Sequence, residues 1–236
     1  MIYNIIHALR KELEESGDVK IQLSGQHFFK EEIKSYGIAT PVVTKIAKKH
    51  FTEVKSKTKK EIFELCDTLW QSGYIEESFI ACHWSYSVRK NYSPDDIKVF
   101  EKWIKNYVSN WASCDTLCNH TVGEFLEMYP IKISVLKEWA TSKNRWVRRA
   151  SSVSLIIPAK HGKFLNDIFE IADILLSDSD DLVQKGYGWM LKAASQANQK
   201  QIFEYIMKKK TGMPRTALRY AIEKMPLELK TQAMQR

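Results

Sequence analysis

Residues 183–189 read VQKGYGW, a helical pattern centred on a glycine that has counterparts at regular intervals along the chain. The counterparts are FIACHWS (79–85), ASCDTLC (112–118), VRRASSV (147–153) and LRYAIEK (218–224). When the five stretches are aligned on Ala81, Asp115, Ala150, Gly186 and Ala221, the separations are 34, 35, 36 and 35 residues. A period of this length is typical of solenoids of paired helices, in which each repeat packs only on its neighbours.

Four of the five aligned positions hold Ala or Gly. A small residue fits where one helix crosses the next closely, because a larger side chain would push the helices apart. The chain has only nine Gly and six Pro, no Asn-Gly or Asp-Gly pair, and apolar residues at spacings of three and four nearly throughout. We therefore expect one all-α domain over residues 1–236, a HEAT-like or ARM-like helical-repeat solenoid.

Turn signals divide this chain into short helices with short connections. SPDD (93–96) predicts a helix start, with Ser93 as the cap and Pro94 at the first helical position. YPIKIS (129–134) separates two helices, and further breaks are expected at SDSDD (177–181), TGMP (211–214) and MP (225–226). The resulting helices are short, as a repeat architecture requires.

Composition narrows the class of protein. The chain is 44% apolar and 27% charged, and no apolar run approaches the length that spans a bilayer, so we expect a soluble protein without a membrane partner. The first residues predict an amphipathic helix instead of a secretory signal, which favours a cytoplasmic location. The formal charge of +8 and the pI near 9.1 favour a polyanionic partner.

The four cysteines predict reduced thiols, since no signal peptide is recognised. Cys114, Cys118 and His120 resemble a zinc-ligand cluster at first sight. On a helix, however, His120 points away from the face that the two cysteines share, and no fourth ligand is near in sequence. We expect small, buried, apolar cysteines and no metal.

Asp115 is the exception among the aligned positions. Trp111, Cys114, Asp115, Cys118 and Val122 fall on one stripe of the helix, so the carboxylate lies on an otherwise apolar face. An unpaired charge in such a place is costly. Either a partner such as an arginine neutralises Asp115, or the carboxylate faces an open groove where its charge is used.

Residues at neighbouring positions of the later repeats favour the groove. Arg149 and Lys185 each precede an aligned position by one residue, and Trp189 follows one by three. Because equivalent positions of a solenoid lie side by side, these residues would join Trp111 and Asp115 on a concave basic wall. The alternative is that the tryptophans are core residues and the charges are ion pairs, since aromatic residues at helical spacing usually pack inside.

Five strings in order along the chain resemble the AlkD-like DNA alkylation repair family, whose members are DNA glycosylases built from HEAT-like repeats. The strings are YGIATP (36–41), NWASCDTL (110–117), NRWVRRA (144–150), VQKGYGWMLKAA (183–194) and MPRTALRYAIEKMP (213–226). No single string is highly specific. The five strings nevertheless follow the order that they have in the family, and the resemblance covers nearly the whole chain.

The resemblance implies hydrolysis of the N-glycosidic bond of alkylated, cationic purines such as 7-methylguanine and 3-methyladenine in duplex DNA, for base excision repair. The family's catalytic Trp, Asp and Arg fall on Trp111, Asp115 and Arg149, and its second groove tryptophan falls on Trp189. Arg149 is preferred to the adjacent Arg148 because it keeps the spacing to NRW and to the following Ala; Arg148 and Lys185 are DNA-binding candidates. Phe28 stands where the family's best-known members have a Tyr near the lesion, which permits stacking and removes a phenolic hydrogen bond.

Two other functions fit the same repeat pattern. One is a non-catalytic HEAT-repeat module that binds damaged or branched DNA, although a carboxylate among cations gives such a binder no advantage. The other is a protein–protein scaffold, which would bind DNA weakly and without a steep salt dependence. We expect a monomeric, monofunctional glycosylase without a cofactor, acting on double-stranded DNA that contains alkylated bases.

Overall fold

The computed structural model describes residues 2–235, and every regular element within that range is a helix. The predicted all-α class and helical-repeat fold are confirmed. The chain forms two compact units, Met1–Leu117 and Cys118–Arg236. One domain over residues 1–236 therefore stays a prediction. Among the described residues, no helix combines the length and the apolarity needed to cross a bilayer.

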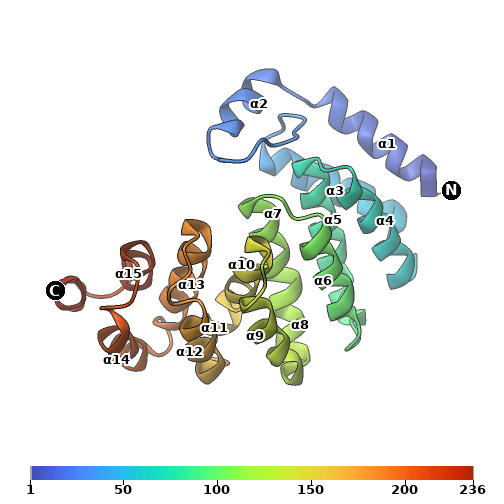
Figure 1. Ribbon diagram of the computed structural model, residues 1–236. Coiled ribbons are helices and arrows are strands. Elements are labelled where there is room, and N and C mark those ends of the chain that lie inside the picture. The colour runs from blue at the N-terminus through green and yellow to red at the C-terminus, as the bar shows by residue number, and fades with distance from the viewer. Residues whose placement is uncertain (1, 236) are drawn as a thin grey trace. The chain divides into compact units, whose positions relative to one another are not determined.

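The first unit is a succession of helices around a central one, α5. Its elements are α1 (Ile2–Glu15), α2 (Val19–Gln26), α3 (Thr40–Val54), α4 (Lys59–Gln71), α5 (Ile75–Ser87), the 3-10 turn η1 (Arg89–Asn91), α6 (Asp96–Asn106) and α7 (Trp111–Thr116). Helix α5 packs against α3, α4 and α7 (Figure 1). The buried indole N–H of Trp84 donates to the carbonyl of Ala47 at 2.9 Å, which satisfies the polar atom of a core tryptophan.

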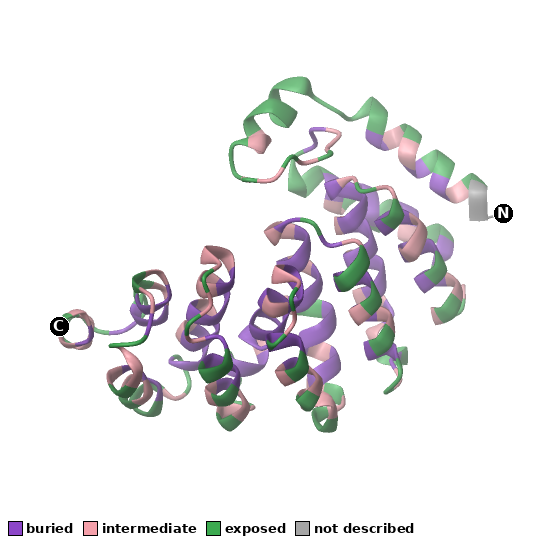
Figure 2. Ribbon diagram, viewed as in Figure 1, coloured by how far each residue is buried: buried purple, intermediate pink, exposed green. Residues whose placement is uncertain are grey.

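Helix α2 differs from its neighbours because none of its residues is buried (Figure 2). Asp18 caps its first turn by accepting from the N–H groups of Lys20 and Ile21. Its side chains Val19 and Leu23 are 69% and 65% exposed. Helix α2 therefore lies on the surface of the first unit.

The second unit contains the remaining repeats. Its elements are the π-helical turn η2 (Leu117–Val122, which begins at the last residue of the first unit), α8 (Gly123–Met128), the 3-10 turn η3 (Pro130–Ile133), α9 (Ser134–Ala140), α10 (Arg145–Val153), α11 (Ile156–Lys160), α12 (Leu165–Ile174), α13 (Asp181–Ala194), α14 (Gln199–Lys209), α15 (Arg215–Ile222) and α16 (Leu227–Met234). Helix α13 is central, since it packs against α10, α11, α12 and α15. Helices α10, α13 and α15 are rich in buried residues (Figure 2), and α13 packs against both of the others.

The aligned positions of the repeat all lie within helices, and all are buried, at Ala81, Asp115, Ala150, Gly186 and Ala221. Glycine is required where α13 crosses its neighbours. A Cβ on Gly186 would lie 2.9 Å from the hydroxyl of Ser152 in α10, and a Cβ on Gly188 would lie 2.7 Å from the carbonyl oxygen of Ala217 in α15. The predicted close crossing is confirmed at Gly186, and Gly188, which is not an aligned position, makes a second close approach on the opposite side of α13.

The start predicted at Ser93 and Pro94 is wrong, because α6 begins at Asp96 with Asp95 as its cap residue. The preceding residues form a tight turn, in which the carboxylate of Asp96 accepts from the N–H of Ser93 at 2.8 Å. Lys59 donates to the same carboxylate at 2.7 Å. This buried carboxylate holds the turn together directly before the helix, which begins two residues later than the Ser-Pro signal indicates.

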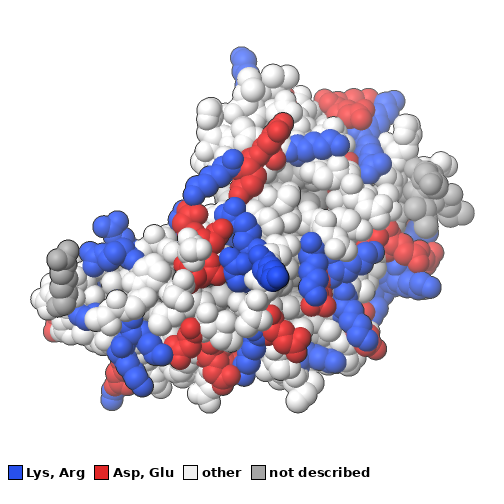
Figure 3. Space-filling model, in the orientation of Figure 1, with Lys and Arg blue, Asp and Glu red and all other residues white. Residues whose placement is uncertain are grey.

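Charged side chains of both signs are mixed over the face shown in Figure 3. Many form ion pairs between elements that are far apart in sequence, such as Lys102 with Asp67 at 2.8 Å and Lys137 with Asp167 at 2.9 Å. Paired lysines of this kind contribute little local positive potential. The net charge of +8 therefore does not by itself locate a basic groove.

Candidate nucleic-acid interface

Helix α7 carries the candidate acid and one candidate aromatic residue. Asn110 caps the helix, since its side-chain oxygen accepts from the N–H of Ser113 at 2.9 Å. Trp111 is the first helical residue and is partly exposed, whereas Asp115 is only 8% exposed. Their spacing of four places the indole and the carboxylate on the same face, one turn apart.

The helix widens two residues after Asp115, because η2, which begins at Leu117, has π-helical hydrogen bonding. Single π-helical turns within α-helices are frequent at functional sites. Cys114, Cys118 and Val122 are fully buried, as the predicted apolar stripe requires, and His120 is exposed. All four cysteines are buried and outside disulfide bonds, and burial raises the pKa of Cys66 well above its usual range.

The indole of Trp111 is held by the segment that follows α2. Its N–H donates to the carbonyl oxygen of Phe28 at 3.2 Å. Its ring stacks on Phe29, with centroids 5.3 Å apart and an interplanar angle of 21°. The Phe28 side chain is 75% exposed. Sequence reasoning singled out Phe28 and missed Phe29, since the adjacent aromatics of QHFFK give no sign of which ring faces the helix.

A cavity of about 300 Å³ opens beside Trp111 within the first unit. Its lining is mostly apolar and comes from α2, the segment after it, and the starts of α5 and α7; it includes Ile21, Phe29, Ile33, Ile38, Phe79 and Trp111. Gln22 and Gln26 also line it, but both amides already donate to main-chain carbonyls, at 2.7 and 2.8 Å. The two glutamine amides are therefore already hydrogen-bonded within the protein, and the cavity beside Trp111 is lined mostly by apolar side chains.

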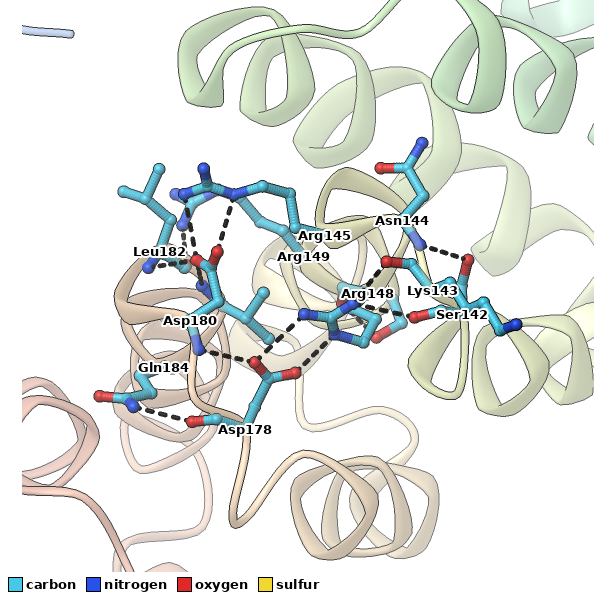
Figure 4. Close-up of polar contacts among 12 residues, drawn as sticks. Ser142, Lys143, Asn144, Arg145, Arg148, Arg149, Asp178, Asp180, Leu182 and Gln184 are labelled. Atoms are coloured by element: carbon cyan, nitrogen blue, oxygen red, sulfur yellow. Dashed lines mark hydrogen bonds and ion pairs between the residues drawn. The ribbon is translucent and has the colours of Figure 1, made fainter. Parts of the chain in front are cut away.

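Arg149 lies in the second unit on α10, which is capped by Asn144. The residue is only 5% exposed, and its guanidinium donates to the carbonyl oxygen of Leu182 in the first turn of α13 (Figure 4). A Cβ on Gly186 would lie 3.4 Å from its Cγ and 3.6 Å from its Nη1. The missing side chain at Gly186 thus provides the space through which Arg149 runs along α13.

Arg148 makes different contacts from Arg149, although the two are adjacent. Its Nε donates to the Asp178 carboxylate at 2.6 Å, and its Nη1 donates to the carbonyl oxygens of Ser142 and Lys143 at 2.9 and 3.1 Å (Figure 4). These bonds tie α10 to the loop before α13. Sequence reasoning treated SDSDD only as a helix break and missed that its first aspartate binds this arginine.

Asp180 of the same loop has two tasks. It accepts from the N–H groups of Leu182 and Val183 and so caps α13. It also pairs with Arg145, whose Nε lies 2.8 Å from the carboxylate and whose guanidinium lies 4.8 Å from the Trp146 ring centroid. This second acid–arginine pair fixes the start of α13 to the start of α10.

Lys185 and Trp189 lie one turn apart on α13. Lys185 pairs with Asp181 at 3.2 Å, and Trp189 is partly exposed. The ammonium of Lys192 lies 5.9 Å from the Trp189 ring centroid and pairs with Glu223 at 2.8 Å. Sequence reasoning missed Lys192, although its position three residues after Trp189 places both side chains on one face of the helix.

Each unit therefore offers a distinct set of groups. The first presents a buried carboxylate and an indole, and the second presents a guanidinium, ammonium groups and another indole. Within the described residues, no three His, Cys, Asp or Glu side chains form a group that could hold a metal ion. A concave basic groove that combines the candidate residues stays a prediction.

Comparisons with known proteins identify relatives of the chain. Its fold is similar to that of a predicted DNA alkylation repair enzyme from Enterococcus faecalis, with a TM-score of 0.81 at 14% identity over 90% of this chain and 98% of that one. It is also similar to the Pseudomonas fluorescens alkylpurine DNA glycosylase AlkC bound to DNA containing an abasic site analog, with a TM-score of 0.53 at 13% identity over 99% of this chain and 66% of that one. No curated protein matches the sequence significantly.

The two structural likenesses show the fold alone at these identities. The sequence itself matches the family model described as DNA alkylation repair enzyme over residues 9–225, which includes every candidate residue named above. This match spans most of both units. The chain belongs to the DNA alkylation repair enzyme family.

Proposed function

We propose that this protein is a monofunctional DNA glycosylase that hydrolyses the N-glycosidic bond of alkylated, cationic purines in duplex DNA. The observation that carries the proposal is Asp115, a buried carboxylate at a register where the other repeats have Ala or Gly. Membership of the alkylation repair family supports the reaction class. The substrates that we expect are 7-methylguanine and 3-methyladenine, and the reaction begins base excision repair.

The chemistry needs few groups. Alkylation gives the purine a formal positive charge, so the base leaves without being protonated, and the sugar passes through an oxocarbenium-like state. A carboxylate close to the sugar stabilises this developing charge and positions the attacking water. At about 4 Å and an effective dielectric constant of about 20, its attraction is on the order of 4 kcal/mol. If it acts only in the transition state, this corresponds to about a thousandfold in rate.

The aromatic and basic residues have supporting roles in this proposal. Trp111 and Trp189 present indole faces to the lesion nucleotide, and each cation–π contact contributes about 0.5–2 kcal/mol. Arg149 binds a backbone phosphate, because a planar guanidinium makes two parallel charged hydrogen bonds. Lys185 and Arg148 contact the DNA backbone in this proposal, although each is paired with an aspartate in the free protein. Phe28 offers an exposed ring for stacking.

The proposal is tested by the release of 7-methylguanine and 3-methyladenine from methylated duplex DNA under single-turnover conditions. Asp115→Asn keeps the shape of the side chain and removes its charge, so we expect excision to fall by about a thousandfold. The matched control is Asp96→Asn, which changes another buried aspartate of the first unit, at 6% exposed. The control should lose stability through its contacts with Lys59 and Ser93 and still release bases.

Two outcomes contradict the proposal. If the wild-type protein releases no base and yet binds DNA, the protein is a non-catalytic DNA-binding module. If Asp115→Asn releases bases as fast as the wild type, a carboxylate at this position is not the electrostatic catalyst.

A further inference from the structure

The segment between α2 and α3, residues 27–39, is here called the strap. Its aromatic pair contacts Trp111 in two ways, through the Phe28 carbonyl and the Phe29 ring. These contacts differ in direction. The hydrogen bond fixes the edge of the indole, and the stacked ring fixes one of its faces.

We propose that Phe29 is a positioning residue for Trp111, and that the strap exists to hold the indole in a single orientation. This inference rests on the proposed glycosylase function, in which Trp111 meets the lesion nucleotide. One indole face is occupied by Phe29, so the nucleotide meets the other face. A ring that is already oriented has less freedom to lose when the substrate binds.

The far end of the strap is anchored by Glu76, the second residue of α5. This residue is 2% exposed, and its carboxylate accepts from the main-chain N–H groups of Tyr36, Gly37 and Ile38, at 3.1, 3.0 and 3.2 Å. It also accepts from the hydroxyl of Ser35 at 2.6 Å. A buried charge with four donors is well compensated, so the strap is firmly joined to the core helix.

The near end of the strap is closed by Gln26, the last residue of α2. Its side-chain amide donates to the carbonyl of Glu31 at 2.8 Å and its oxygen accepts from the N–H of Ile33 at 2.9 Å. The strap is therefore fixed on both sides of Phe29. Its backbone acts as a rigid support and not as a free loop.

Glycine is required where the strap crosses the start of α2. Gly37 has a φ of +80°, and a Cβ there would lie 2.2 Å from the carbonyl oxygen of Asp18. Tyr36 stacks on Tyr74, with centroids 3.9 Å apart, and its hydroxyl donates to Glu77 at 2.8 Å. Through these contacts, residues 36–39 (YGIA) anchor the strap to the first unit.

Nuclear magnetic resonance tests the contact independently of activity. The indole N–H resonance of Trp111 is assigned by its loss in Trp111→Phe. In Phe29→Leu, which stays apolar but cannot stack, we expect this resonance to shift and its exchange with solvent to become faster. Phe29→Tyr keeps the ring and should keep the wild-type resonance.

The matched control is Phe169→Leu. Phe169 is also a partly exposed ring in a stacked pair, with Tyr205 at 4.8 Å and 20°, but it belongs to the second unit. This variant should leave the Trp111 resonance unchanged. If Phe29→Leu also leaves the resonance and its exchange unchanged, the proposal is wrong.

Excision kinetics test the consequence. A misplacement of about 1 Å can reduce a rate by about 100-fold, so we expect Phe29→Leu to lower the single-turnover rate by about 10- to 100-fold. KM for duplex DNA should change little, because the phosphate contacts are made elsewhere, and Phe29→Tyr should restore the rate. An indole that moves without any loss of rate overturns the positioning role. A wild type that releases no base overturns the proposed function instead, and the resonance alone then decides whether Phe29 holds Trp111.

Discussion

Adjacent residues of the same type take different positions at this protein's candidate site. Arg148 and Arg149 are neighbours, yet one pairs with Asp178 and the other runs along Gly186 to the carbonyl of Leu182. The sequence predicts which arginine keeps the family's spacing. It does not predict the acid that binds the other one, because that acid lies 30 residues away in a loop.

The Arg148–Asp178 pair provides a prediction about stability. The two side chains are 19% and 7% exposed, so Asp178→Asn leaves a largely buried guanidinium without its anion, and we expect it to lower the free energy of unfolding by about 3 kcal/mol. The matched control is Asp95→Asn in the exposed pair with Lys98, at 80% and 77% exposed, which should change little. Urea unfolding of both variants measures the difference. If the two variants have equal free energies of unfolding, the Arg148–Asp178 ion pair does not stabilise the protein.

Contacts with distant segments also could not be predicted for the aromatic residues of the site. The register of the repeat predicts that Trp111 and Asp115 share a helix face, and the structure places both on α7. The ring that stacks on Trp111 belongs to residue 29, which is 82 positions earlier in a segment without periodicity. Helical periodicity carries information about faces of one helix, whereas contacts made by irregular segments depend on the path of the backbone.

At the scale of helices, the repeat is the part of the fold that the sequence predicts best. All aligned positions lie within helices because the 3.6-residue period and the small residues specify the same packing. The exact start of α6 could not be predicted, since Asp96 forms a turn with Ser93 through a side chain that also binds Lys59. Local start signals locate the end of a helix only to within one or two residues.

The crossing of α13 and α15 gives a prediction at this scale. Gly188→Ala would place a Cβ 2.7 Å from both the carbonyl oxygen of Ala217 and the Cβ of Tyr220. Because the backbone of α15 cannot move away without a cost in packing, we expect the variant to be destabilised by about 1–3 kcal/mol, despite the better helix propensity of alanine. Gly25→Ala on α2 is the control, because no atom lies within 4 Å of its Cβ, and it should stabilise by up to about 1 kcal/mol. Thermal unfolding of both variants compares them, and a neutral Gly188→Ala would contradict the close crossing.

At the scale of the whole molecule, the balance of 36 basic against 28 acidic residues is the property that bears on its partner. Many of the basic side chains are paired with acids, so only some remain to neutralise phosphates. Binding that releases counterions from about five phosphates gives a slope of about −4.5 for log K against log salt concentration. We expect a slope of this order for unmodified duplex DNA, measured by fluorescence anisotropy between about 50 and 200 mM salt.

The proposed interface makes this slope sensitive to particular lysines. Lys185→Gln on α13 should reduce the magnitude of the slope by about 0.9, the contribution of one phosphate. Lys98→Gln on α6 removes the same charge from an exposed pair with Asp95 and should leave the slope unchanged. If both variants change the slope equally, the attraction comes from net charge and not from a defined surface. If the wild-type slope is close to zero, the chain does not bind DNA through phosphates, and a protein-binding scaffold of the same repeat type becomes the better explanation.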